Sequence, residues 1–174
     1  RLRPFLPPPP PAPPRAISPE EQLRLAAMIS KRISSFDAKL VDLQEGETLF
    51  STHCRVCHQV GGQGGLIGPQ LTGIGVRGLE RIAEDVLDPN RNVDAHFRLT
   101  VLTLKDGTTA GGFIGSESGE VIQLIDASGQ ARRFLLSEVV SREVSAMTLM
   151  PAVFGDLLSE ADFRDLAGWL LKQR

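Results

Sequence analysis

One five-residue segment, Cys54-Arg55-Val56-Cys57-His58, constrains this chain more than any other part of it. Two thiols three residues apart on an incipient helix can reach the two vinyl groups of one porphyrin and form thioethers. The imidazole of His58 then lies beneath the iron as its fifth ligand. Cys54 and Cys57 are the only cysteines, so no disulfide framework competes for them. The segment therefore predicts one covalently attached haem.

Two other uses of a Cys-x-x-Cys pair stay open at this point. A dithiol redox pair is typical of a thioredoxin-like fold, but no strand-helix-strand pattern surrounds the motif. A structural zinc site usually has four ligands, and only His53, His58 and His96 remain to join the two sulfurs. Haem attachment is the favoured interpretation.

Length, composition and charge limit the remaining classes. The 174 residues suffice for one good-sized domain or two small ones, and a hydrophobic content of 41% is ordinary for a globular protein. No apolar run approaches the ~18 residues of a membrane span. The formal net charge is −2 and basic residues are scattered among acidic ones, so a nucleic-acid partner is not expected. A start at Arg1, without an apolar signal core, fits a processed protein or a segment of a longer one.

Residues 1–18 are expected to form a proline-rich tether. The unbroken run Pro7 to Pro11 cannot form a packed core and favours an extended polyproline helix. We expect a stiff connection to a membrane anchor or another domain; a ligand for a proline-recognition module and a strap along a partner subunit are the alternatives. Residues 19–42 should be a leading helix and its connection, with Ser18 as N-cap, Pro19 in the first turn and an end near Ser34.

Two helices flanking the chemistry are expected to cross. Asp42 opens a helix that runs through Gly46 and Phe50 into the cysteine motif, and Ser159 opens a final helix that carries Trp169. Gly46 and Phe50 lie four residues apart, hence on one helix face. A glycine there permits close approach of the final helix, while Phe50 adds apolar area beside the porphyrin. A further helix is expected at 79–87, ended by Asp88-Pro89.

The pattern changes to short alternating strands between His96 and Ser145. Strands are expected at 97–101, 113–114, 121–125 and 134–140, with tight turns at Asp106-Gly107, Ser118-Gly119 and Ser128-Gly129. Four or five short strands joined in this way are typical of a small antiparallel barrel of SH3-like or Sm-like type. Its basic residues are too few to indicate RNA binding, and it contains no catalytic set.

Met150 is the predicted sixth ligand of the iron. It stands in Leu149-Met150-Pro151, just ahead of the final helix, where the proline fixes the backbone and holds the thioether against the metal. Met147 is the reserve candidate. The others considered are Met28, His53 and His96.

Gly68-Pro69-Gln70-Leu71 follows His58 by about ten residues. The Pro69 carbonyl is expected to accept a hydrogen bond from the second ring nitrogen of His58, which fixes the ring and raises its basicity as a ligand. Leu71 would then cover the haem face. The glycines at 61–65 are not a nucleotide loop, since no strand precedes them and no Gly-Lys-Ser follows; they are expected to let the backbone pass close to the porphyrin edge. Candidate propionate partners are Arg77, Arg81 and Arg91, each of which could equally belong to a solvated helix face.

In their order, these motifs resemble the haem-binding cytochrome domains of Planctomycetes and Verrucomicrobia. The resemblance covers roughly residues 43 to 174. The matching pieces are Gly46-Glu-Thr-Leu-Phe50, Cys54 to His58 with Val60-Gly61-Gly62, Gly68-Pro-Gln-Leu71, Asp88-Pro-Asn90, Thr103-Leu-Lys-Asp-Gly107 and Leu149-Met-Pro151 ahead of Leu166 to Leu170. In this group a strand-rich segment stands between the histidine and methionine ligands, which accounts for the 92 positions from His58 to Met150.

The resemblance implies an α+β chain. Its 43–95 and 146–174 segments would form an all-α, class I cytochrome c-like fold, interrupted at 96–145 by the small antiparallel β-barrel. One haem c would be attached through Cys54 and Cys57, with His58 and Met150 as iron ligands.

The function implied is that of a monohaem electron carrier rather than an enzyme. It would pass single electrons between protein redox partners, as a subunit or tethered domain of a respiratory, photosynthetic or dehydrogenase assembly. Export to the periplasmic side of the cytoplasmic membrane is implied, with the proline-rich N-terminus and the barrel available for membrane anchoring or subunit contact. The alternative is a haem-based sensor or a peroxidase-like enzyme in which Met150 leaves the iron.

Overall fold

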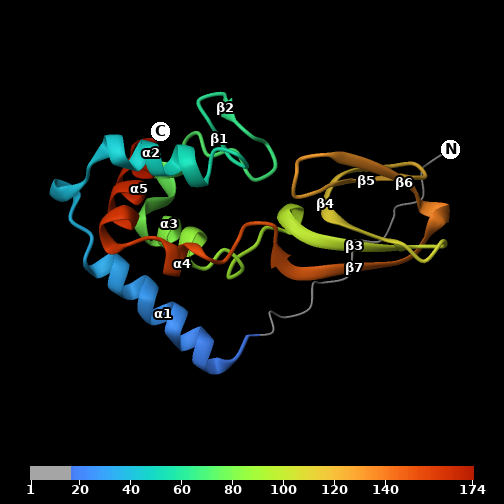
Figure 1. The fold of residues 1–174 in the computed structure, drawn as a ribbon, viewed down its shortest axis with the longest axis horizontal. Coiled ribbons are helices and arrows are strands. Elements are labelled where there is room, and N and C mark those ends of the chain that lie inside the picture. The colour runs from blue at the N-terminus through green and yellow to red at the C-terminus, as the bar shows by residue number, and fades with distance from the viewer. Residues whose placement is uncertain (1–16) are drawn as a thin grey trace.

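The computed structural model describes residues 17–174 (Figure 1), so most of the predicted tether lies outside the described residues. The described chain is α+β and has two parts that lie side by side: a helical half and a sheet half. The helices are α1 (Pro19–Ser34), α2 (Leu43–His53), α3 (Gly78–Leu87), α4 (Phe154–Leu157) and α5 (Glu160–Lys172). None of the helices in residues 17–174 is both long and apolar enough to cross a bilayer.

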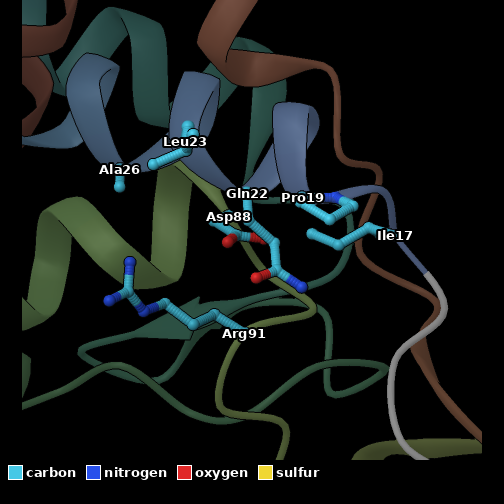
Figure 2. A pocket seen from close by; sticks show the side chains of 7 residues that line it. All are labelled: Ile17, Pro19, Gln22, Leu23, Ala26, Asp88 and Arg91. Carbon is cyan, nitrogen blue, oxygen red and sulfur yellow. The ribbon is translucent and has the colours of Figure 1, made fainter.

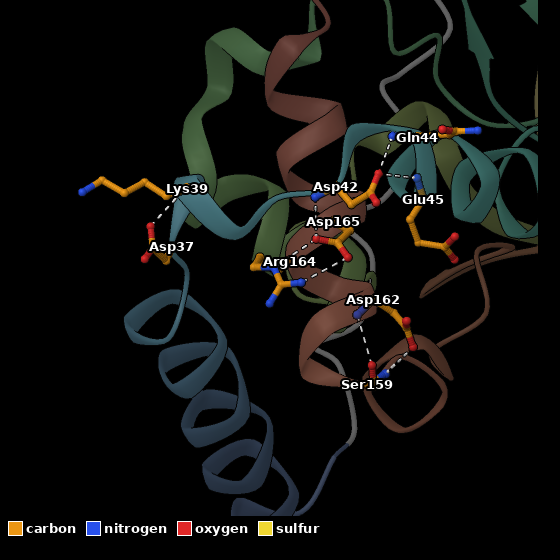
Figure 3. Close-up of polar contacts among 9 residues, drawn as sticks. All are labelled: Asp37, Lys39, Asp42, Gln44, Glu45, Ser159, Asp162, Arg164 and Asp165. Atoms are coloured by element: carbon orange, nitrogen blue, oxygen red, sulfur yellow. Dashed lines mark hydrogen bonds and ion pairs between the residues drawn. The ribbon is translucent and has the colours of Figure 1, made fainter.

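The helix starts follow from the capping residues that the sequence shows. Ser18 accepts from the backbone N–H of Glu21, and Asp42 accepts from those of Gln44 and Glu45. Ser159 and Asp162 form a reciprocal capping box at the start of α5 (Figure 3). The predicted bounds of α1 and the predicted starts of α2 and α5 are thus confirmed. Helix α3 begins at Gly78, one residue before its predicted start, and ends at Leu87 as expected.

The sheet half contains five antiparallel strands in the order β6-β5-β4-β3-β7. Figure 1 shows β3 and β7 in one layer and β5 and β6 in another, with β4 passing between them. Strand β4 pairs with β3 through residues 109–112 and with β5 through 113–118, and a register shift falls between Ile114 and Ser116. The strands are β3 (Arg98–Leu104), β4 (Thr109–Ser118), β5 (Val121–Ile125), β6 (Ala131–Leu135) and β7 (Val139–Thr148).

One strand expectation was wrong. The segment 134–140 is not a single strand, because the 3-10 helix η4 (Leu136–Glu138) divides it into the end of β6 and the start of β7. The backbone N–H of Leu136 bonds to the Glu120 carbonyl at 2.7 Å, which continues the β5–β6 register by one pair. The Val139 N–H then bonds back to the Leu136 carbonyl, which closes a 3-10 turn and ends the ladder. Strand β7 then pairs with β3 at the opposite edge of the sheet from β6.

Each half has its own apolar core. The helical core contains Phe50, Leu87, Phe163 and Leu166, each about 1% exposed. The sheet core is smaller and contains Leu102, Ile122 and Leu124 with Ala110 and Phe134. The remaining elements are short: the hairpin β1 (Gln59–Val60) and β2 (Gln63–Gly64), and the 3-10 helices η1 (Ala38–Leu40), η2 (Ile74–Arg77) and η3 (Ala95–Phe97).

Candidate functional site

The cysteine motif forms a tight turn at the C-terminal end of α2. The Cys54 N–H closes the helix on the Phe50 carbonyl at 2.8 Å. The N–H groups of Cys57 and His58 then both bond to the Cys54 carbonyl, at 3.1 and 2.8 Å. Both cysteines are free thiols and half-buried. The turn therefore places two thiols and one imidazole close together in the chain, beside the apolar core of the helical half.

His58 is held in the orientation predicted from the sequence. Its ring is buried, and Nδ1 lies 2.8 Å from the Pro69 carbonyl oxygen. Burial lowers the pKa of His58, an effect that the Pro69 bond opposes by favouring the protonated ring. A neutral imidazole whose Nδ1–H is given to a carbonyl presents Nε2 as its free lone pair, which is the arrangement of a metal-ligating histidine.

Glycines hold the loop that follows against this turn. Gly65 donates to the Arg55 carbonyl at 2.9 Å, and Gly68 donates to the Cys57 carbonyl at 2.8 Å. A Cβ atom on Gly68 would lie 2.6 Å from Cε1 of the His58 ring, so only glycine leaves room for the imidazole here. Two further glycines, Gly61 and Gly62, have positive φ angles and open space around them. The glycines that approach the motif closely are therefore Gly64, Gly65 and Gly68, while the expected passage of residues 61–65 along the porphyrin edge stays a prediction.

Helices α2 and α5 cross as predicted. A Cβ on Gly46 would lie 2.7 Å from Cβ of Trp169, and the rings of Phe50 and Trp169 have centroids 4.7 Å apart. Asp165, 5% exposed, fixes the crossing by accepting at 3.0 Å from the backbone N–H of Asp42 (Figure 3). Arg164 pairs with the same carboxylate at 3.0 Å. The structure therefore anchors the start of α2 on the middle of α5.

Met150 lies in the segment between β7 and α4, and is half-buried against the helical core. Cys54, Leu71 and Trp169 pack on the same core. Met147, the reserve candidate, is 41% exposed. Of the predicted site residues, Phe50, Cys54, Leu71 and Met150 thus belong to one apolar cluster, and His58 is joined to the exposed Pro69 by its hydrogen bond.

Asn90 is a residue of this region to which the sequence analysis assigned no role. It is only 4% exposed, and its Oδ1 accepts at 2.9 Å from the backbone N–H of Thr148, two residues before Met150. The Thr148 hydroxyl in turn accepts from the Met150 N–H at 3.4 Å. Because Thr148 is distant from Asn90 in the sequence, this contact was not expected. The only local signal was an amide side chain directly after the Asp88-Pro89 helix stop.

Burial also affects the first cysteine. It raises the pKa of the Cys54 thiol to about 12, with a smaller contribution from Cys57. Arg55, between the two cysteines, has a buried Nε without a hydrogen-bond partner among the described residues. The thiol of Cys54 is therefore protonated at neutral pH.

The remaining candidates have other contacts. Arg81 pairs with Asp85 at 2.9 Å, Arg77 approaches the same carboxylate at 3.7 Å, and Arg91 approaches Glu84 at 3.6 Å. His96 is exposed at η3. His53 lies edge-on to the Phe154 ring at 6.2 Å. The ion pairs of the three arginines favour the alternative interpretation, in which these side chains belong to a solvated helix face.

The geometry leaves the two other uses of the cysteine pair without support. Within residues 17–174, no group of three His, Cys, Asp or Glu side chains is arranged to hold a metal ion. The motif follows α2 and precedes a two-residue strand, which is not the strand-helix-strand setting of a dithiol oxidoreductase.

A groove at the start of α1, lined by residues such as Leu23, Asp88 and Arg91, shares no residue with the candidate site (Figure 2).

Comparison with known protein families gives a match over the part of the chain that contains the cysteine motif. The family model described as cytochrome c matches residues 43–99, which is less than half of the chain. No curated protein matches the sequence. The match supports a c-type cytochrome domain with a haem-binding role in electron transfer, and such domains are typically exported. It implies covalently attached haem c, and the CxxCH spacing at Cys54, Cys57 and His58 lies inside the matched range.

Proposed function

We propose that this chain is a monohaem c-type cytochrome that passes single electrons between protein partners. Thioethers would form at Cys54 and Cys57, and His58 and Met150 would be the axial ligands of the iron. The observation that carries the proposal is the buried His58 ring, fixed by the Pro69 carbonyl at 2.8 Å, directly after two free cysteines. The bound haem would supply the metal that gains and loses the electron.

The residues around the site would tune that exchange. The Pro69 bond holds His58 in one tautomer and one orientation, so the ligand moves little when the charge of the metal changes. A thioether opposite an imidazole raises the reduction potential. The apolar side chains of Phe50, Leu71 and Trp169 would act in the same direction, since a poorly solvated site disfavours the more highly charged ferric state. One porphyrin edge, near the cysteines, would face the redox partner.

The chain would be divided as in the Planctomycetes and Verrucomicrobia domains. Residues 43–95 and 146–174 would form the cytochrome domain, with 96–145 as an inserted barrel of SH3-like or Sm-like type. Support comes from the two separate apolar cores and from the strand order β6-β5-β4-β3-β7. Residues 1–18 would be the tether, and 19–42 the leading helix with its connection.

The setting would be the exported side of the cytoplasmic membrane, within a larger respiratory, photosynthetic or dehydrogenase assembly. We expect protein donors and acceptors and no enzymatic reaction on this chain alone. The inserted sheet would serve subunit contact. Deleting residues 97–144 should then preserve the haem spectrum and abolish association with the assembly that copurifies with the intact protein. Retained association of the deleted protein would refute this role.

Replacing the proposed ligand tests the assignment. Met150→Ala should remove the sulfur-to-iron charge-transfer band of the ferric protein and lower its midpoint potential, while Met147→Ala should leave both unchanged. Optical spectra and a redox titration of the two variants provide the measurement. The reverse result would transfer the role to Met147.

Carbon monoxide separates the carrier from the sensor or peroxidase-like alternative. With Met150 bound to the ferrous iron, the reduced protein should show little spectral change on brief exposure. A rapid and complete change would contradict the simple carrier and favour a displaceable ligand.

A further inference from the structure

Helix α1 lies outside both the family match and the resemblance, and several of its polar side chains reach the segment that follows Met150. Arg24 Nη1 lies 3.2 Å from Asp156 Oδ1. Lys31 forms an ion pair with Glu160. Figure 1 shows α1 running along the outside of the helical half beside α4 and α3.

The strongest of these contacts is buried. Arg32 is 9% exposed, and its Nη2 donates to the Leu158 carbonyl at 2.6 Å. Its guanidinium also lies 5.8 Å from the centre of the Phe163 ring. A charge-assisted hydrogen bond under cover of apolar side chains is worth more than an exposed ion pair. Arg32 therefore fixes the junction between α4 and α5.

Met28 adds an apolar contact at α4 itself. A Cβ on Gly155 would lie 2.8 Å from the Met28 sulfur, so the thioether rests on the bare backbone of α4. The buried Leu25 and Ile29 alternate with these residues along α1, which also packs against α3. Helix α1 thus joins α3 to α4 and to the start of α5.

The segment that needs this support is short and weakly held. Residues 151–153, between Met150 and α4, are exposed. Helix α4 has only four residues and no side-chain cap, so it has little stability of its own. Before Met150 the chain is held by Asn90 through Thr148. After Met150, the contacts of α1 at residues 155–160 provide a second anchor.

We infer that α1 positions the Met150 ligand: Arg32 and Met28 hold α4 and the start of α5 in place, and so keep the thioether at the iron. The inference rests on the proposed function, in which Met150 is the sixth ligand. A thioether is a weak, neutral ligand, so its occupancy depends on how rigidly the polypeptide presents it. Loosening this anchor should speed the departure of Met150 without detaching the haem.

The experiment follows displacement of Met150 by imidazole in the ferric holoprotein. At saturating imidazole, the limiting rate reports departure of the native ligand. Arg32→Leu keeps the apolar bulk but removes the donor to Leu158, and should raise this rate about tenfold, the factor for about 1.4 kcal/mol. Arg32→Lys, which can still donate one hydrogen bond, should restore most of the wild-type rate.

Two controls and a second test variant accompany this series. Leu23→Ala changes a side chain on α1 that is 72% exposed and should leave the rate unchanged. Ile122→Ala lowers overall stability from the sheet core, so a rate equal to wild type would show that global destabilisation is not the cause. Met28→Ala is the second test variant in case Arg32→Leu fails to fold, and should raise the rate about threefold while keeping the charge-transfer band.

The outcomes separate the inference from the proposed function. If Met150→Ala leaves the charge-transfer band of the wild-type protein intact, the ligand assignment itself fails. If Met150→Ala removes the band but Arg32→Leu and Met28→Ala exchange imidazole at the wild-type rate, the ligand stands and the role of α1 is overturned. An equal rise in Ile122→Ala would also overturn it.

Discussion

The helical half and the sheet half differ in what their cores serve. The helical core carries Phe50, Leu71 and Met150 around a turn that holds two thiols and an imidazole. The sheet core is built of apolar side chains such as Leu102 and Ile122, and the strands present no cluster of candidate metal ligands among the described residues. The candidate site therefore lies in the helical half alone. In the sequence, the sheet half stands between the two segments that form the helical half.

The geometry of the sheet explains how that interruption is tolerated. Strand β3 begins where β7 ends, with Arg98 opposite Thr148, so the segment leaves and re-enters the helical half at neighbouring points. Asn90 bonds to Thr148 at the same place. An insertion whose ends meet costs little loop-closure entropy in the parent fold. The 92 positions between His58 and Met150 thus need not separate them in space.

The sharpest test of this difference truncates one large side chain in each core. Phe163→Ala should cost about 3–5 kcal/mol and Ile122→Ala about 2–5 kcal/mol in unfolding free energy. Only Phe163→Ala should also weaken the charge-transfer band, since Phe163 lies on α5 in the core of the helical half and its ring packs under the Arg32 guanidinium. Chemical denaturation and optical spectra measure both effects. Equal spectral changes in the two variants would mean that the halves are not separate.

A smaller effect is expected at the helix crossing. Gly46→Ala should cost about 1–3 kcal/mol, because the new methyl group meets the Asp165 carbonyl and Trp169. The matched control is Gly111→Ala in β4, where the nearest atom to the added Cβ is 3.9 Å away and the change should stay within about 0.5 kcal/mol. Thermal melting of both variants provides the measurement. Similar losses of stability in the two variants would contradict a particular requirement for glycine where α2 packs on α5.

Asn90→Ala tests the joint between the halves. Removing the buried amide leaves the Thr148 N–H without its acceptor, at a cost of about 1–3 kcal/mol. We also expect faster exchange of imidazole at the iron. Asn92→Ala, which removes an exposed hydrogen bond to Glu84, should cost less than about 0.5 kcal/mol. If the two asparagine variants behave alike, Asn90 does not support the Met150 segment.

The smallest effect is a pH dependence confined to the sheet half. A hydrogen bond from Ser128 holds the pKa of Asp126 below its ordinary value of 3.8. A carboxyl group with a lowered pKa contributes stability above 3.8 and loses it as the pH falls through the folded pKa. Asp126→Asn should therefore flatten the dependence of the urea midpoint on pH below about 4. Parallel curves for the variant and the wild type would contradict this contribution.

Local signals in the sequence predicted the parts of the fold that depend on neighbouring residues. The caps at Ser18, Asp42 and Ser159 fix helix starts within one turn, and Gly46 marks a close crossing. The bond from His58 to Pro69 was predictable because both residues stand in one short segment. The spacing of Cys54, Cys57 and His58 was recognisable for the same reason, whereas the role of Met150 stays a prediction.

Contacts of single polar side chains with distant segments were not predictable. The role of Asn90 depends on Thr148, which is far from it in the sequence. The anchoring of α1 depends on Arg32 meeting the Leu158 carbonyl. Nothing in the composition of these segments identifies their partners, because a single polar side chain in a helix or loop is compatible with many packings.

The central claim is that one haem is bound covalently at Cys54 and Cys57 beneath His58. Mass spectrometry of the purified protein, before and after extraction with acidified acetone, tests it most directly. We expect the intact mass to exceed that of the polypeptide by one haem, and the pigment to stay with the protein after extraction. A colourless protein, or a pigment that passes into the acetone and leaves the bare polypeptide mass, would contradict the account.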